Sequence, residues 1–233
     1  MCGRFTITRR DGNSLAAELG VSPDSFVDYR PRYNVAPTQP HFIVRIKYEN
    51  REVIPATWGL IKSGSKDASM AAKTINARSE TVDTRGAFRD AFQKRRCVVP
   101  ADGFFEWTGP KTARQPTWFH REDSGLILFA GLYEAWQKEH GVWQTTFTIL
   151  TTSANALLES YHDRMPVILA DRDADDWMDP RAPDPHALKG LLVPAPADLL
   201  IATPVSPDVN NVDNDSPDLL QPAGQMNLSL RSG

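Results

Sequence analysis

The stretch LILFAGLYEAW (Leu126–Trp136), together with WQTTFTILT (Trp143–Thr151), decides the fold class of this 233-residue chain. Both segments are rich in β-branched and aromatic residues, which favour extended strands. A turn signal around Gly141 separates them. Two runs of this kind predict a pair of long β-strands.

The rest of the chain adds further short strands. FIVRIKY (Phe42–Tyr48) alternates apolar and polar residues, and with VIPATWGLI it predicts a hairpin with a longish loop at Glu49–Glu52. CVVPADGFFEW (Cys97–Trp107), MPVIL and LLIATPV are also β-rich. Helices are expected at the following ranges: 84–96, 153–161, 171–178 and 186–192. Strands outnumber helices without regular alternation, which predicts an α+β fold with a largely antiparallel, barrel-like core.

The amino-acid composition limits the class of protein to which this chain can belong. The chain is 41% hydrophobic and 24% charged, which is typical of one globular domain rather than of a disordered chain. We expect a single compact domain over residues 1–220 and a loose tail over residues 221–233. The longest apolar stretch, Leu126–Tyr133, is much shorter than the roughly 20 residues of a membrane span. Two cysteines and no secretory signal predict a cytoplasmic protein with reduced thiols.

The charge is unevenly distributed along the chain. Residues 1–125 hold 20 Lys+Arg against 14 Asp+Glu, whereas residues 126–233 hold 6 against 15. The first half would therefore contact a polyanionic partner. Solvated surface charge is the alternative interpretation.

Cys2 is the most informative residue. Initiator methionine is normally removed before a small residue, which would leave cysteine at the N-terminus. Its α-amine has a pKa of about 7.7–8.0, against about 10.4 for lysine, so much of it is free base near neutral pH. A free amine adds to an aldehyde, and the adjacent thiol can then close a five-membered thiazolidine. An amidotransferase-like nucleophile is the competing interpretation, in which the thiol attacks an amide and the α-amine is the base.

Glu106 and His162 are candidates for proton transfer. Glu106 lies among the aromatic residues of GFFEW, and a carboxylate in apolar surroundings has a raised pKa. His162 precedes a predicted strand in YHDRMPVIL, and histidine is the natural acid–base group near neutral pH. An exposed strand-end glutamate and a structural histidine are the alternatives. The histidines form no metal-binding pattern with the cysteines, so neither a metal nor a cofactor is predicted.

Other residues suggest nucleic-acid contacts. Arg78 and Arg164 follow Asn76 and His162 by two residues, and arginine suits bidentate contact with phosphate. Trp58 belongs to the aromatic residues that could stack on bases, although such side chains more often lie in the core.

A set of motifs then matches one known family. They run in order from Met1 to about Pro217: MCGRF, YNVAPTQ (Tyr33–Gln39), WGLI (Trp58–Ile61), NARSET (Asn76–Thr81), RRCVVPADGFFEW (Arg95–Trp107), AGLYEAW (Ala130–Trp136), HDRMPVIL (His162–Leu169) and VSPDVNNVDNDSP (Val205–Pro217). With these motifs the chain resembles the SRAP family (SOS response-associated peptidase), which includes bacterial and eukaryotic abasic-site processing proteins.

The resemblance implies a function and a site. It implies a β-rich domain that binds single-stranded DNA and crosslinks abasic sites through a thiazolidine at the N-terminal cysteine. It also implies removal of Met1, weak lyase activity, a monomer, and a bacterial cytoplasmic protein that works at the nucleoid or replication fork. The implied catalytic residues are Cys2, Asn76, Glu106 and His162. The implied DNA-binding residues are Arg78, Arg164, Arg4, Asn34 and Trp58.

Three hypotheses stay open from the sequence. The first is a covalent abasic-site binder, the second an amidohydrolase or peptidase with Cys2 as thiol nucleophile, and the third a non-catalytic single-strand-binding module.

Overall fold

Five strands close into a barrel at the centre of the molecule. The computed structural model describes residues 2–110, 112–138 and 141–224. Pairing runs from β10 to β4, β3, β6 and β9 and returns to β10. Only the β10–β4 contact of this ring is parallel. The barrel strands are β3 (Pro40–Lys47), β4 (Asn50–Trp58), β6 (Arg96–Ala101), β9 (Ile127–Gln137) and β10 (Trp143–Ser153).

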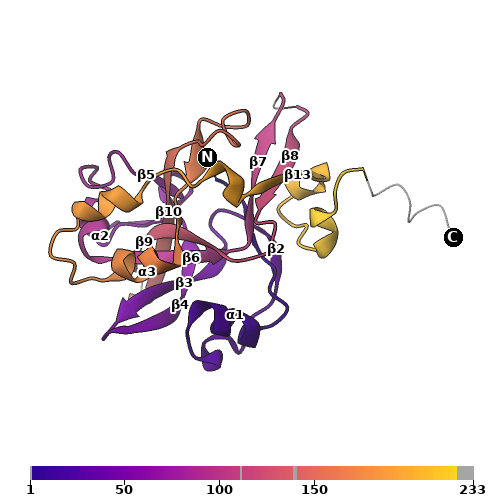
Figure 1. Cartoon of the computed structure of the whole chain (residues 1–233). Helices are drawn as coiled ribbons and strands as arrows, with labels where there is room; N and C mark the ends of the chain where they lie inside the picture. Colours follow the sequence, from indigo (N-terminus) through magenta and orange to yellow (C-terminus); the bar gives the residue numbers. More distant parts are fainter. Residues whose placement is uncertain (1, 111, 139–140, 225–233) are drawn as a thin grey trace.

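Shorter strands extend the barrel and form a second sheet. β5 (Asn76–Arg78), β11 (Arg164–Pro166) and β12 (Ile168–Leu169) pair with β10 or β9. The second sheet has the order β13-β8-β7-β1-β2, and its β7–β8–β13 part lies to one side of the barrel strands in Figure 1. Its strands are β1 (Phe5–Ile7), β2 (Arg32–Val35), β7 (Gly103–Thr108), β8 (Gln115–His120) and β13 (Ile201–Pro204). The predicted α+β class with a largely antiparallel, barrel-like core is confirmed.

Helices are short and cover one side of the barrel. α2 and α3 pack against β6 and β9, while α1 lies at the bottom of the view in Figure 1. The α-helices are α1 (Gly12–Leu19), α2 (Arg89–Lys94) and α3 (Asp171–Met178). The 3-10 helices are η1 (Pro23–Phe26), η2 (Ala71–Lys73), η4 (Ala187–Leu191), η5 (Ala197–Leu199), η6 (Pro207–Asn210) and η7 (Pro217–Leu220). Within the described ranges no helix is long and apolar enough to cross a membrane.

The core divides into two main clusters at the barrel wall. β6 is buried on both faces, and successive side chains of a strand point to opposite faces. Val98 therefore packs with Phe92 and Trp177 of the helices, whereas Val99 packs in a cluster that also contains Cys2. This second cluster links the barrel to the N-terminal strand and brings the chain's start against the core.

Two sequence predictions of local structure were wrong. Residues 153–161 form no helix: β10 runs to Ser153, and the Asn155 side chain accepts from the Leu158 N–H and donates to the Ala195 carbonyl. The Asn155 contact with Leu158 is typical of a helix cap, but the segment continues only as turns before β11. The predicted loop at Glu49–Glu52 is a two-residue turn, Tyr48–Glu49, with both residues at positive φ. That turn type normally uses Asn-Gly, so its usual signal is missing.

The structure also differs from the sequence in the bounds of other predicted segments. Of the helix predicted over residues 84–96 only Arg89–Lys94 is helical, because β6 begins at Arg96. The helix predicted over 186–192 is the 3-10 helix η4, whereas the helix predicted over 171–178 is confirmed as α3. Ala223 still donates its N–H to the Pro204 carbonyl, so ordered pairing continues beyond the predicted boundary at residue 220. Residues 225–233 of the predicted tail lie outside the described residues.

Candidate active site and nucleic-acid interface

Cys2 is held in the core at the edge of the second sheet. β1 pairs with β2 on one side and with β7 on the other, and the Phe105 N–H donates to the Arg4 carbonyl at 3.0 Å. The Cys2 side chain is fully buried, with its sulfur 3.8 Å from the Arg4 carbonyl oxygen. Burial raises the pKa of the Cys2 thiol, and the Glu106 carboxylate acts in the same direction. The thiol is therefore neutral at physiological pH.

Asn76 forms a hydrogen bond with the backbone of Cys2. It begins β5, which pairs in parallel with β10 at Ile149. Its side-chain Nδ2 donates to the Cys2 carbonyl at 2.8 Å. Its Oδ1 is buried and accepts no hydrogen bond from the described residues. Asn76 thus holds residue 2 with one end of its amide and presents an acceptor with the other.

Glu106 and His162 line one cavity with the N-terminal segment. The cavity measures about 910 Å³ and is bordered by Gly3 and Arg4 as well as by Glu106 of β7 and His162. Burial raises the pKa of the Glu106 carboxyl, and the nearby His162 acts in the opposite direction. A carboxyl with a raised pKa is better suited to exchange protons near neutral pH than one with the ordinary value.

The Nδ1 atom of His162 has two alternative contacts. It accepts the Arg164 N–H at 2.9 Å, and the Asp163 carboxylate lies 2.7 Å from the same atom. One nitrogen cannot accept and donate at once, so the two contacts require different placements of the ring proton. The first contact places the proton of the neutral ring on Nε2. The second requires a proton on Nδ1, which then donates to Asp163.

A second cavity adjoins Asn76 and is strongly basic. It measures about 760 Å³, and its lining contains Asn76, Lys73, Arg78 and Arg85 but no acidic residue. The three cationic side chains are exposed. Sequence reasoning identified Arg78 but missed Lys73 and Arg85, for which the charge excess of the first half was the only signal. Arg114, another missed cation, lines the Glu106 cavity.

The side chains of Arg164 and Arg4 already form hydrogen bonds within the protein. The Arg164 guanidinium forms a bidentate pair with Glu80 and donates to the Thr151 carbonyl at 2.6 Å, and its side chain is 11% exposed. Arg4 donates to the Asn34 side chain and to the Val209 carbonyl, both at 2.8 Å. Partial burial lowers the pKa of the Arg4 guanidinium. Arg78 makes no ion pair with another described residue and is therefore the freest of the predicted arginines.

Asn34 and Trp58, two of the predicted DNA-binding residues, are both buried. Trp58 is fully buried and donates its indole N–H to the Ile75 carbonyl, so it offers no stacking surface. Asn34 is also buried, and its Nδ2 donates to the carbonyls of Val209, Asn211 and Asn214. Burial argues against direct DNA contact by either side chain in this conformation, and their role in DNA binding stays a prediction. Trp58 is a core residue, and Asn34 holds the 209–214 loop that walls the Glu106 cavity.

Comparison with known proteins assigns the chain to a family. The sequence profile described as SOS response associated peptidase (SRAP) matches residues 1–212. The chain belongs to the SRAP family. The abasic site processing protein YoqW of Bacillus subtilis is 40% identical over 226 residues, which cover 95% of this SRAP chain and 99% of YoqW. The abasic site processing protein YedK of Escherichia coli is 33% identical over 230 residues, covering 95% of this chain and all of YedK.

Solved structures share the fold of this SRAP protein. A crystal structure of a protein from Bacteroides thetaiotaomicron superposes with a TM-score of 0.84 at 26% identity, covering 94% of this chain and 99% of the other. Another, from Bordetella bronchiseptica, gives a TM-score of 0.76 at 28% identity, covering 88% and 100%. Among the described residues no group of three His, Cys, Asp or Glu is placed to hold a metal ion.

Proposed function

We propose that this SRAP protein binds single-stranded DNA and links covalently to abasic sites through Cys2. The observation that carries the proposal is the common cavity of Glu106, His162 and the N-terminal segment, with Asn76 holding the Cys2 carbonyl. Relatives of this length and similarity are named abasic site processing proteins. An abasic site offers an aldehyde in its open-chain form, which is the partner that an N-terminal aminothiol requires.

The reaction joins two atoms of Cys2 to one carbon. After removal of Met1, the α-amine adds to the aldehyde carbon and the carbinolamine loses water to give an imine. The thiol S–H then adds across the C=N bond: sulfur bonds to the former aldehyde carbon, and its proton ends on nitrogen. One water molecule is released, and nothing is oxidised or reduced.

The neighbouring side chains suit the proton transfers. His162 with its proton on Nε2 can protonate the ring oxygen of the closed sugar and so assist its opening. Glu106 can take a proton from the amine or donate one to the departing hydroxyl. The free Oδ1 of Asn76 can accept a hydrogen bond from the amine and orient it.

The state of the thiol favours the amine as the first nucleophile. Thiol nucleophiles in hydrolases react as thiolates and are activated by a lowered pKa. Burial instead raises the pKa of the Cys2 thiol. A neutral thiol is poor at attacking an amide but can still close onto an imine. This contrast favours the aldehyde linkage over the amidohydrolase hypothesis.

Cations on both sides of Cys2 mark a path for the strand. The two cavities that flank the Cys2–Asn76 contact hold five exposed or half-buried cations and one acid, Glu106. The cations are Arg4, Lys73, Arg78, Arg85 and Arg114. We infer that Arg78 contacts phosphate directly, because it is exposed and forms no ion pair with any residue that the structure describes. Arg164 can do so only after releasing Glu80.

A crosslinking assay tests the proposal. Mature protein mixed with single-stranded DNA carrying one abasic site should give a heat-stable shifted band whose mass equals protein plus DNA minus water. Cys2→Ser should lose this band, whereas Cys97→Ser, which alters an equally buried internal thiol, should keep it. Two extra residues ahead of Cys2 should also abolish it. A heat-stable band from Cys2→Ser at the wild-type yield would overturn the thiazolidine.

Lyase and peptidase activities are secondary proposals. An imine that does not close onto sulfur can undergo β-elimination, so we expect more strand cleavage from Cys2→Ser than from the wild type. Removal of Met1 by the protein itself is checked by the intact mass of protein made with methionine aminopeptidase inhibited. A mass that still includes Met1 would show that the cellular aminopeptidase, and not the protein itself, removes this residue.

A further inference from the structure

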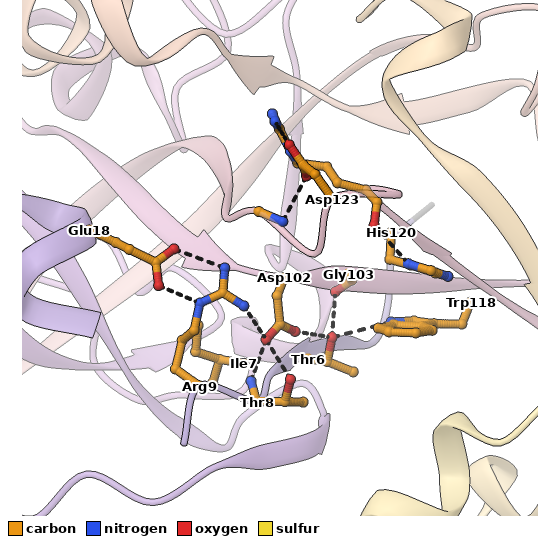
Figure 2. Close-up of polar contacts among 12 residues, drawn as sticks. Thr6, Ile7, Thr8, Arg9, Glu18, Asp102, Gly103, Trp118, His120 and Asp123 are labelled. Atoms are coloured by element: carbon orange, nitrogen blue, oxygen red, sulfur yellow. Dashed lines mark hydrogen bonds and ion pairs between the residues drawn. The ribbon is translucent and has the colours of Figure 1, made fainter. Parts of the chain in front are cut away.

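Asp102 joins the N-terminal segment to the strand that carries Glu106. It lies at the junction of β6 and β7 and is 4% exposed. One carboxylate oxygen accepts the Thr6 hydroxyl at 2.6 Å, and the other accepts the Thr8 hydroxyl at 2.7 Å and the Thr8 N–H. Arg9 approaches the second oxygen at 3.6 Å. Figure 2 shows all these donors converging on Asp102.

The network continues to both sides of the carboxylate. Arg9 is itself held by Glu18 of α1 through two hydrogen bonds of 2.7 and 2.9 Å. The Trp118 indole N–H donates to the Thr6 hydroxyl oxygen at 3.3 Å. In Figure 2 the Trp118 ring reaches Thr6 from the side opposite Arg9. A buried carboxylate with this many donors is satisfied only while the segment keeps its place.

The strand that these contacts hold would otherwise be weak. β1 has three residues, and chain ends fray unless they are tied down. Its register on β7 pairs Phe5 with Phe104 and Thr6 with Gly103. Continued by two residues beyond Phe5, that register sets Gly3 beside Glu106. A slip of one residue turns every side chain of a strand to the opposite face.

Through Thr6 and Thr8, the Asp102 carboxylate favours one register of the N-terminal segment on β7. The two threonines lie two residues apart, so their hydroxyls point to the same face of the segment. A one-residue slip would bring the side chain of Ile7 to the carboxylate, and an apolar side chain has no proton to donate. The observed register brings both threonine hydroxyls to the oxygens of Asp102, and a one-residue slip would lose both.

We propose that Asp102 is a positioning residue for the N-terminal nucleophile, because its contacts with Thr6 and Thr8 set the register that places Cys2 at Asn76 and Glu106. The inference rests on the proposed function in taking Cys2 as the nucleophile. The placement itself can be tested without any reaction on DNA.

Alkylation of the two cysteines measures the placement directly. Both thiols are fully buried, so Cys97 reports global opening while Cys2 reports local release of the N-terminal segment. A hydrogen bond to a charged group can change a local opening equilibrium about 10- to 100-fold. Thr6→Val should therefore raise the alkylation rate of Cys2 relative to Cys97 about tenfold or more. Thr6→Ser keeps the hydroxyl and should stay near the wild type. An equal ratio of Cys2 to Cys97 alkylation rates in the wild type, Thr6→Val and Thr6→Ser would overturn the proposal.

A functional measurement separates positioning from stability. Thr6→Val should slow single-turnover crosslinking about tenfold while leaving the affinity for undamaged single strands unchanged. Leu132→Ala, a core substitution in β9, which does not pair with β1, should lower the melting temperature without slowing the reaction. Thr8→Val replaces Thr6→Val if that variant does not fold. A wild type that forms no crosslink contradicts the proposed function, whereas an unchanged cysteine ratio in Thr6→Val contradicts the role of Asp102.

Discussion

Arg78 and Arg164 are similar in the sequence but should behave differently when replaced by alanine. Arg78 is exposed and lines the basic cavity beside Asn76. Each phosphate neutralised on a single strand contributes about −0.7 to the slope of log affinity against log salt. Arg78→Ala should therefore reduce that slope by about 0.7 and weaken binding about tenfold at low salt. As an exposed substitution, it should change the free energy of unfolding by about 0.5 kcal/mol at most.

Arg164→Ala should act mainly on stability. The exposed pair with Glu80 contributes about 0.2–1 kcal/mol. The charged hydrogen bond to the Thr151 carbonyl is partly buried and adds about 1.5–3 kcal/mol. The expected loss in the free energy of unfolding is therefore about 2–4 kcal/mol, with little change in the salt slope.

Two assays decide between these roles. Fluorescence anisotropy with an undamaged oligonucleotide across a salt series gives the slopes, and urea denaturation gives the free energies of unfolding. Glu80→Gln is the matched control, since it breaks the same ion pair without removing a cation. If Arg164→Ala reduced the slope as much as Arg78→Ala and left stability unchanged, the assignment of Arg164 to the fold would be refuted.

The remaining predictions concern three other buried groups. The folded state raises the pKa of Glu106 above 4.5, so the folded protein binds this proton more tightly than the unfolded chain does. Ionisation of Glu106 therefore lowers the free energy of unfolding as pH rises above 4.5. Glu106→Gln should therefore gain stability relative to the wild type as pH rises above 4.5 in urea titrations. Its crosslinking should slow by about 10²–10⁴-fold. A relative loss of stability with rising pH would contradict the burial argument. Arg96 is 2% exposed and donates to the carbonyls of Phe92, Gln93, Trp177 and Asp179, so Arg96→Leu should cost about 3 kcal/mol or more in the same titration. Asn34→Ala should speed amide hydrogen exchange across residues 209–214 without altering exchange in β10, and equal exchange in that loop would show that Asn34 does not hold it.

Local pattern was sufficient for the β-rich class and for α3. Alternation and β-branched composition act over a few residues, and β3, β4, β9 and β10 follow them closely. The errors came where distant contacts replaced local preference. The turn at Tyr48–Glu49 has no turn residues of the usual kind, and the segment after Ser153 must return at once to pair β11 with β10.

The sequence by itself determined which reactive groups the chain carries: the Cys2 thiol, the Glu106 carboxyl, the His162 imidazole, and an excess of cations in the first half. The tertiary structure alone decided which of them meet. Burial and pairing are long-range properties, so no local pattern could show that Arg164 is bound by Glu80 while Arg78 is exposed. For the same reason only the fold reveals that Asp102 holds the segment that bears Cys2, because its donors come from a strand far away in the chain.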